Sequence, residues 1–462
     1  MNGVKFSEAA SFCHGKISGT NPDAFFTGVS TDTRKVGQKS LFVALKGDRF
    51  DAHDFVGAAI AQGAAGVVVE ESRGIELPAG AIKIEVTDTL IALQQIAAGY
   101  RRKLPVKTVA VTGSNGKTST KEFTAAVLSK GFVTRKTLGN LNNHIGVPLT
   151  IFQLDTDTQM GVIEMGMNHA GELAPLMEIA QPIIGIVTNV SPVHIENFKD
   201  ENGIAEEKAT VVRGIPADGH AIINLDDKWC PIVSKGVTAK IMTFGINNQS
   251  ATLWADAMST GKDGIRYTLH HEGKSYPAFS PVFGEHMVYN AMAGSLAGLI
   301  SGLSWEAICA GLAEVQLPGM RMQQLQIKGV NLINDAYNAN PVSMAAGLKT
   351  LKTVGAGTNC FAVVGTMYEL GSLAVEEHKN VGRLAAELGL DGLFARGEFA
   401  TQIIQGAREA GMKPGQVSAV NEALEIATLL NQQCKPGDHV LIKGSRGAKM
   451  EEVVAAWQQL AQ

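Results

Sequence analysis

The sequence predicts an α/β protein of three domains, and three observations lead to this prediction. Short apolar runs alternate with segments of helical periodicity along most of the 462-residue chain. A glycine-rich turn separates one such strand from its helix at residues 113–116. Two domain boundaries are indicated, one around the helical segment Thr87–Lys103 and one at Leu317-Pro318-Gly319. We therefore expect domains at 1–86, 87–317 and 318–462.

The first domain should be a small α/β module. Three apolar runs read as its strands, and a polar, aspartate-rich stretch extends from Thr31 to Asp54 around the first of them. These runs are Leu41–Leu45, Gly66–Val69 and Ala81–Val86. The helix that follows ends in Arg101-Arg102-Lys103 before Pro105, and basic residues followed by proline are a helix stop.

The second domain should hold a parallel sheet with helices on both faces, because strands and helices alternate there. The expected elements are strand Thr108–Val111, helix Lys117–Leu128, strands Met160–Met165 and Ile183–Val187, and helices at 286–300 and 305–313. Residues 219–280 differ, with short alternating strands such as Ala251–Met258 and Ile265–His270. We expect this stretch to form an antiparallel appendage or sheet edge.

The third domain repeats the alternation on a smaller scale and should also be doubly wound. Its expected strands are Val330–Asp335, Phe361–Val364, Gly392–Ala395 and His439–Ile442. Its expected helices are Ser343–Leu351, Val375–Leu388, Ala400–Ala410 and a closing helix after the last strand.

Composition narrows the class of protein. The formal charge of -4 gives no reason to expect a nucleic-acid partner or an anionic membrane surface. The five cysteines are scattered without zinc spacing, which is typical of reduced thiols in the cytoplasm. The chain has no secretory signal pattern and no apolar run of ~18 residues, so we expect a cytoplasmic protein with no membrane insertion.

The segment Val109 to Ser119 carries the strongest functional signal. A strand enters a loop containing Gly113 and Gly116, and Lys117-Thr118 then opens a helix. Backbone N–H groups of such a loop wrap phosphate oxygens, and the helix amino terminus adds partial positive charge. We expect Lys117 to reach the β- and γ-phosphates and the Thr118 hydroxyl to ligate Mg²⁺. The first position of the general pattern is Val111 instead of glycine, so a glycine-rich turn without nucleotide is the alternative.

Three further side chains could complete a magnesium site, each with a plainer alternative. Glu164 closes an expected strand, where a carboxylate faces the ligand crevice of an open α/β sheet, but it could be a solvated strand-end charge. His194 follows a second strand end, although a lone histidine is more often structural. Lys208 lies on the next expected helix, and from composition alone it is a surface lysine.

Together these residues resemble the Mur ligases and folylpolyglutamate synthases. Thr112-Gly-Ser-Asn-Gly-Lys-Thr118 is similar to the shortened TGTNGKT loop of those proteins. Four other stretches resemble the Mur ligases in particular, and the resemblance as a whole runs from Ser30 to Val453. These stretches are Gly139-Asn-Leu-Asn-Asn143, Ile145-Gly-Val-Pro148, Asn334-Asp-Ala-Tyr-Asn-Ala-Asn-Pro341 and Lys443-Gly-Ser-Arg446.

The resemblance implies an amino-terminal domain for a UDP-sugar, a central ATPase domain and a Rossmann-like carboxyl-terminal domain that closes on it. It also implies a monomeric ATP- and Mg²⁺-dependent ligase that joins D-alanyl-D-alanine to UDP-N-acetylmuramoyl-tripeptide through an acyl phosphate. The two asparagine-rich stretches favour this reaction over that of a sister ligase or folylpolyglutamate synthase. A regulatory ATPase and a non-catalytic wall scaffold are the rivals from other classes.

The resemblance also assigns residues. It makes Lys117, Lys208 and Arg321 catalytic, with Lys208 as a carbamylated lysine and Arg321 directed at the γ-phosphate. Metal ligation falls to Thr118, Glu164, His194 and Lys208. ATP binding falls to Gly113, Ser114, Asn115, Gly116, Lys117, Thr118, Ser119, Asn290 (adenine side), Arg321 and Asp335 (ribose side). Substrate binding falls to Thr33, Arg34, Gly47, Asp48, Asn140, Asn142, Asn143, Tyr337, Asn338, Asn340, Lys443, Ser445 and Arg446.

Two positions depart from the family pattern. Lys208 is followed by Ala-Thr where the family usually has Gly-Glu after the lysine. Thr366, in Gly365-Thr-Met-Tyr-Glu-Leu-Gly371, stands where the family usually has aspartate.

Overall fold

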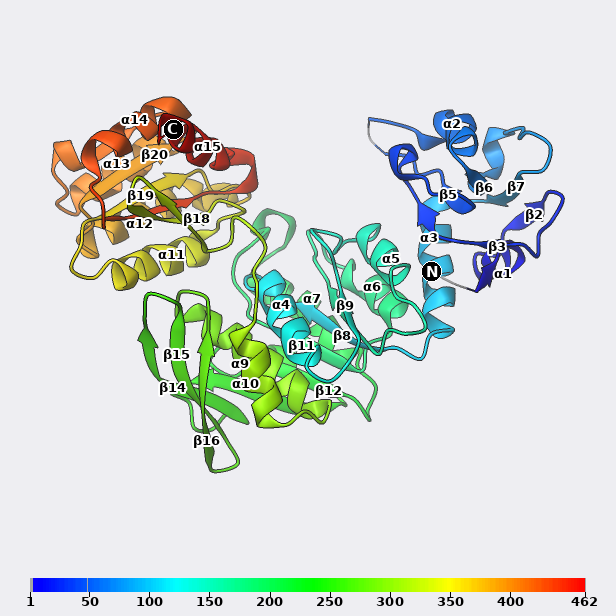
Figure 1. Ribbon diagram of the computed structural model, residues 1–462, viewed down its shortest axis with the longest axis horizontal. Helices are drawn as coiled ribbons and strands as arrows, with labels where there is room; N and C mark the ends of the chain where they lie inside the picture. Colours follow the sequence, from blue (N-terminus) through cyan, green and yellow to red (C-terminus); the bar gives the residue numbers. More distant parts are fainter. Residues whose placement is uncertain (1–2, 48, 462) are drawn as a thin grey trace.

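The computed structural model describes residues 3–47 and 49–461 and shows three α/β units along the chain (Figure 1). The amino-terminal unit (blue) and the carboxyl-terminal unit (yellow to red) stand on either side of a larger central one (cyan to green). The predicted α/β fold with three domains is confirmed. Within the described ranges, no helix is long and apolar enough to cross a membrane.

The amino-terminal unit is a five-stranded sheet in the order β2-β7-β6-β5-β4. The four strands β7, β6, β5 and β4 are parallel, and β2 pairs with β7 antiparallel. Its elements are β1 (Val4–Lys5), α1 (Phe6–Phe12), β2 (Lys16–Ser18), β3 (Phe25–Phe26), β4 (Val29–Ser30), β5 (Ser40–Val43), α2 (Val56–Ala61), β6 (Ala64–Glu70) and β7 (Ile82–Val86).

Helix α3 (Thr89–Arg102) links this unit to the central one. Asp88 caps it by accepting hydrogen bonds from the N–H groups of Leu90 and Ile91, which are otherwise unpaired at a helix start. The helix ends within one residue of the predicted stop. Near that end Arg101 is buried and donates to the carbonyl oxygens of Ala180 (3.0 Å) and Val106 (2.6 Å), so it ties the helix to the central unit.

The central sheet has nine strands in the order β16-β15-β14-β13-β12-β11-β8-β10-β9. Strand β8 lies between β11 and β10, so the loop that follows it opens at the middle of the parallel part. The strands are β8 (Lys107–Thr112), β9 (Thr134–Lys136), β10 (Met160–Glu164), β11 (Ile184–Val187), β12 (His220–Asn224), β13 (Lys240–Ile246), β14 (Leu253–Thr260), β15 (Ile265–His271) and β16 (Lys274–Ser280). The helices are α4 (Lys117–Leu128), α5 (Gly146–Ile151), α6 (Leu173–Ala180), α7 (Glu201–Arg213), α8 (Cys230–Ser234), α9 (His286–Ile300) and α10 (Trp305–Ala313).

The antiparallel edge expected in residues 219–280 is present only in part. Strand β15 pairs antiparallel with β14 on one side and with β16 on the other, as predicted. The first part of the stretch is different, because β12 and β13 continue the parallel sheet from β11. The sheet edge therefore begins later than the sequence pattern indicated.

The carboxyl-terminal sheet has six strands in the order β17-β18-β22-β19-β20-β21, all parallel except β17. Its strands are β17 (Gln323–Ile327), β18 (Val330–Asp335), β19 (Cys360–Gly365), β20 (Gly392–Arg396), β21 (Val417–Ala419) and β22 (His439–Lys443). Its helices are α11 (Pro341–Val354), α12 (Ala374–Glu387), α13 (Ala400–Glu409), α14 (Ala423–Gln433) and α15 (Glu451–Ala461).

Candidate active site

The glycine-rich loop connects the end of β8 to the first residue of α4, as predicted. Gly113 and Gly116 both have positive φ, 150° and 79°. A Cβ at Gly113 would lie 1.8 Å from the Thr188 hydroxyl, and one at Gly116 would lie 2.6 Å from Asn290 Oδ1. Both positions therefore require glycine for conformation and for space.

The loop is held by the segment after β11. Ser114 N donates to Asn189 O (2.8 Å), and Asn115 N donates to Asn189 Oδ1 (3.0 Å). The Thr188 hydroxyl donates to Asn115 O (2.5 Å), and the Ser114 hydroxyl donates to Ser191 O (2.9 Å). The loop is thus fixed in shape by its neighbour, which lowers the cost of ordering it around a ligand. Sequence reasoning missed Thr188, Asn189 and Ser191, although a polar run directly after a buried strand is a usable signal.

Lys117 lies over the loop. Its ammonium donates to Gly113 O (2.8 Å) and Ser114 O (3.2 Å). Burial lowers its pKa; the neighbouring Glu164 carboxylate opposes this shift, and Arg321 adds to it. A partly desolvated cation at the loop mouth attracts an anionic ligand strongly, since little water screens it.

Glu164 lies beside the first turn of α4, at the carboxyl end of β10. Its Oε1 accepts hydrogen bonds from the Thr118 hydroxyl (3.1 Å) and Asn142 Nδ2 (2.8 Å). Its buried Oε2 has no hydrogen bond among the residues that the structure describes, and Lys121 Nζ is 3.7 Å away. The predicted partners Thr118 and Glu164 are therefore adjacent, and one carboxylate oxygen remains without a donor.

His194 and Lys208 come from two further segments of the central unit. His194 adopts the left-handed conformation (φ 59°), and its Nδ1 is 2.6 Å from Glu369 Oε2 of the carboxyl-terminal unit. Lys208, on α7, is 3% exposed, and its ammonium has no hydrogen bond or ion pair within the described part of the chain. Burial, reinforced by the charge of Lys117, lowers the Lys208 pKa well below its ordinary value. Three or more His, Cys, Asp or Glu side chains do not converge on a metal position anywhere in residues 3–47 and 49–461.

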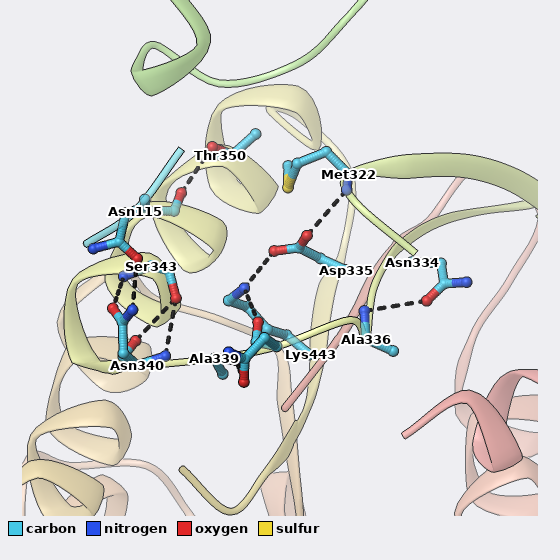
Figure 2. Close-up of polar contacts among 12 residues, drawn as sticks. Asn115, Met322, Asn334, Asp335, Ala336, Ala339, Asn340, Ser343, Thr350 and Lys443 are labelled. Carbon is cyan, nitrogen blue, oxygen red and sulfur yellow. Dashed lines mark hydrogen bonds and ion pairs between the residues drawn. The ribbon is translucent and has the colours of Figure 1, made fainter. Parts of the chain in front are cut away.

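The carboxyl-terminal unit brings a second set of polar groups to the loop (Figure 2). Asn340 Nδ2 donates to Asn115 Oδ1 across the junction (2.5 Å). Lys443 pairs with Asp335 (2.5 Å) and donates to Asn338 O (3.0 Å), so these predicted residues form one group. The Arg321 guanidinium lies 3.9 Å from the centre of the Tyr337 ring. Met320 and Met322, on either side of Arg321, both have positive φ, which marks a constrained turn just after the predicted domain boundary.

These two sets face one cavity of about 830 Å³, which is large enough for a nucleotide and part of a second ligand. Most of the predicted ATP, metal and substrate residues line it. They are Ser114, Asn115, Gly116, Lys117, Thr118, Ser119, Asn140, Asn142, Asn143, Glu164, His194, Asn290, Arg321, Asp335, Tyr337, Asn338, Asn340 and Lys443. Ser445 and Arg446 line a smaller neighbouring cavity of about 190 Å³.

Three predicted UDP-sugar residues do not reach either cavity. Thr33, Arg34 and Gly47 lie on the amino-terminal unit, and the Arg34 side chain is 85% exposed and paired with Asp32. Asp48 lies outside the described residues.

Asn290, predicted for the adenine side, lies against the loop itself. Its Oδ1 accepts from the Thr120 hydroxyl (2.9 Å) and is the atom that a side chain at Gly116 would strike.

The cavity also has polar walls that sequence reasoning missed. Asp226 follows β12 and accepts from Ile246 N (2.7 Å) and from the Tyr289 hydroxyl (2.9 Å). His286, at the start of α9, lines the cavity, and burial lowers its pKa to about 4. For Asp226, a polar group just after a strand end was again the available signal.

A glycine-rich loop between a central parallel strand and a helix, facing a large cavity, is the arrangement of phosphate-loop nucleotide-binding proteins. Family descriptions agree and are more specific. The chain matches the Mur ligase family, catalytic domain, over residues 25–101, the Mur ligase middle domain over 111–298, and the Mur ligase, glutamate ligase domain over 320–446.

Individual relatives match over nearly the whole chain. The UDP-N-acetylmuramoyl-tripeptide--D-alanyl-D-alanine ligase of Bacillus subtilis is 36% identical, with 92% of each chain covered. The Escherichia coli protein of the same name is also 36% identical, with 99% of each covered. Among solved structures, MurF from Acinetobacter baumannii has a TM-score of 0.89 at 30% identity over 99% of each chain. MurF ligase from Thermotoga maritima in complex with ADP has a TM-score of 0.83 at 26% identity, covering 94% of this chain and 97% of that one.

The chain belongs to the Mur ligase family. The resemblance inferred from the sequence motifs is confirmed.

Proposed function

We propose that this protein is an ATP-dependent amide ligase that joins D-alanyl-D-alanine to UDP-N-acetylmuramoyl-tripeptide in peptidoglycan precursor synthesis. One observation carries the proposal: the phosphate loop and the Asn338–Asn340 stretch of the carboxyl-terminal unit line the same cavity. A nucleotide on the loop would then meet an acceptor held by the second unit. Relatives of that name, 36% identical over almost the full length, support this choice of substrates.

The chemistry follows from the weakness of a carboxylate as an electrophile. A carboxylate oxygen of the tripeptide attacks the γ-phosphorus of ATP, the bond from that phosphorus to the β,γ-bridging oxygen breaks, and ADP leaves. The dipeptide amine then attacks the carbonyl carbon of the acyl phosphate and loses a proton. The carbon–oxygen bond to phosphate breaks, and the amide remains.

The chain's own residues supply positioning and charge in this scheme. Lys117 at the loop and Arg321 on the opposite side neutralise the migrating phosphoryl oxygens. Removing one such contact costs about 3–4 kcal/mol of transition-state stabilisation. Asp335 and Asn290 lie on the nucleotide side, while Asn140, Asn142, Asn143, Tyr337, Asn338, Lys443, Ser445 and Arg446 contact the peptide substrates.

The residues present fit magnesium. Mg²⁺ prefers oxygen ligands and retains several waters. The Thr118 hydroxyl and the Glu164 carboxylate are adjacent, and Glu164 Oε2 has no hydrogen-bond donor within the described ranges. These two residues would hold one ion, and His194 with Lys208 would hold a second. Bound there, the ions would neutralise phosphate charge.

Lys208 fits the role of a carbamylated lysine. Its amine is buried, and burial together with the nearby charge of Lys117 lowers its pKa well below the ordinary value, which favours the neutral, nucleophilic amine over what an exposed lysine would offer. Addition of CO₂ to that amine forms a nitrogen–carbon bond and releases a proton. The product is an anionic oxygen ligand in place of a cation beside Lys117, which removes the repulsion between the two lysines.

The remaining assignments complete the proposal. The amino-terminal domain (1–86), with Thr33, Arg34, Gly47 and Asp48, takes the UDP-sugar, and the domain at 318–462 closes on the ATP-binding domain at 87–317. The protein works as a monomer in the cytoplasm.

The test is mass spectrometry of the product. Purified protein with ATP, Mg²⁺ and both substrates should give a UDP-linked pentapeptide only when every component is present, with equimolar phosphate. Lys208→Ala should abolish the product, and Lys262→Ala, on an exposed loop, should not. If phosphate were released without pentapeptide, the protein would use ATP but would act on the acceptor of a sister ligase. If folded protein released no phosphate and formed no pentapeptide, the proposal would be refuted.

A further inference from the structure

The structure joins the central and carboxyl-terminal units at a second point, away from the Asn115–Asn340 contact. His194 Nδ1 lies 2.6 Å from Glu369 Oε2, and these residues belong to different units. The surrounding loops also lie close together, because a Cβ added at Gly371 would come within 3.9 Å of the Glu196 Cβ. Glu369 belongs to the loop in which Thr366 replaces the usual family aspartate.

The Glu369 loop is rigidly built. Met367 N donates to His378 Nε2 (2.8 Å), and Tyr368 N donates to the Ser445 hydroxyl oxygen (3.1 Å). The buried His378 is itself oriented, since its Nδ1 is 2.6 Å from Ala374 O. Because Nδ1–H donates to that carbonyl, Nε2 is left as the acceptor that Met367 needs. The loop is thus held on both of its backbone amides just before Glu369.

Both partners are in a costly backbone conformation. His194 has φ 59° and Glu369 has φ 64°, and neither is glycine. A residue with a side chain in this region costs on the order of 1 kcal/mol or more and persists only where its surroundings impose it. The two residues with positive φ are the two that meet across the units.

We propose that Glu369 is a positioning residue for a divalent cation at His194, supplied by the closing domain. The carboxylate faces Nδ1, which leaves Nε2 as the nitrogen available to a cation. A carboxylate behind a metal-binding histidine fixes its tautomer and ring orientation and raises its basicity. The 2.6 Å separation is that of an ion pair, and Nδ1 makes no aligned hydrogen bond to any other group of the described residues.

The placement has a consequence for the order of events. Since Glu369 lies on the carboxyl-terminal unit, the cation site at His194 reaches full affinity only when that unit is docked. Cation binding and domain closure therefore stabilise each other. This inference rests on the proposed metal role of His194, but not on the identity of the substrates.

The experiment is direct Mn²⁺ binding, measured by electron paramagnetic resonance of the full chain with a non-hydrolysable ATP analogue. Glu369→Gln keeps size and hydrogen bonding but removes the charge, and Glu369→Asp keeps the charge. Glu376→Gln is the control, because that exposed carboxylate lies on α12 and pairs only with Arg383 among the ion pairs of the described chain. Each variant is also compared with the parent in a His194→Ala background.

Glu369→Gln should weaken the His194-dependent Mn²⁺ site by about 10-fold or more. Glu369→Asp should recover part of the lost Mn²⁺ affinity, and Glu376→Gln should bind Mn²⁺ as the parent does. In the His194→Ala background, Glu369→Gln should not lower Mn²⁺ affinity any further. Three results would each overturn the proposal. Glu369→Gln could leave Mn²⁺ binding unchanged, it could cause an equal loss of binding in the His194→Ala background, or the parent could show no His194-dependent Mn²⁺ site at all. Pentapeptide synthesis by the parent is assayed separately, so a wrong acceptor would leave this result intact.

Discussion

The Asn340 side chain makes two contacts, a helix cap and a hydrogen bond to the phosphate loop, and different substitutions should remove them separately. Its Oδ1 accepts from Ser343 N (3.0 Å), which caps helix α11, and its Nδ2 donates to Asn115 Oδ1 of the phosphate loop (2.5 Å). Asn340→Ala removes both contacts. Asn340→Asp keeps the cap, because aspartate caps as well as asparagine does, but it places a carboxylate against an amide oxygen.

The magnitudes follow from these contacts. Loss of the cap should lower the free energy of unfolding by about 1 kcal/mol. Loss of the cross-domain hydrogen bond removes roughly 0.5–1.5 kcal/mol from the closed form alone. Asn340→Asp adds repulsion at that point, so its kcat/KM should fall about 10-fold while its stability stays within roughly 0.5 kcal/mol of the parent. Asn340→Ala should lose both stability and activity.

Urea unfolding and steady-state kinetics under varied ATP measure the two effects. Ser343→Ala is the matched control, because it weakens the same capping box through the Ser343 hydroxyl, which accepts from Asn340 N (3.0 Å), and leaves the loop contact intact. It should lose stability without losing kcat/KM. If Asn340→Asp kept parental kcat/KM, the cross-domain contact would have no part in catalysis and the reasoning would fail.

Three further predictions concern the same cavity. Lys117→Ala should lower kcat/KM by about 10²–10³ while the protein remains folded, and a smaller loss would remove Lys117 from the reaction. Arg321→Lys keeps the charge but not the planar group above Tyr337 (3.9 Å), so kcat should fall about 10-fold or more, and parental kcat would show that charge alone suffices. His286 stays neutral in the folded chain down to about pH 4, whereas the unfolded chain takes up its proton near pH 6.5. Its contribution to stability is therefore full above pH 6.5 and declines toward pH 4, by at most about 3 kcal/mol, and His286→Gln should flatten that part of the urea-stability profile.

Local patterns predicted much of the fold. Helix α4 begins at Lys117 as expected, because a glycine turn and a strand fix its start. Helix α11 begins at Pro341, two residues before the predicted Ser343, and the Asn-Pro cap that sets this start is readable in the sequence. The parallel pairing of β12 and β13 was missed because short alternating runs fit an antiparallel edge equally well.

The sequence predicted individual residues of the candidate site, and the structure shows which of them contact one another. Strand-end polar residues such as Glu164 could be located from pattern, since carboxyl ends of parallel strands share one edge. The Asn115–Asn340 bond joins residues 225 positions apart, and no local pattern encodes such a pairing. The same holds for His194 and Glu369, whose contact depends on how two separately folded units dock.

Isotope transfer tests the central claim, that this cavity activates a carboxylate with ATP, most directly. Tripeptide labelled with ¹⁸O in its free carboxylate would be turned over with ATP and D-alanyl-D-alanine, and the released phosphate analysed by mass spectrometry. An acyl phosphate requires one labelled oxygen to leave with each phosphate, and we predict that result. Phosphate without label, formed alongside product, would contradict the account, because the carboxylate oxygen would never have been bonded to phosphorus.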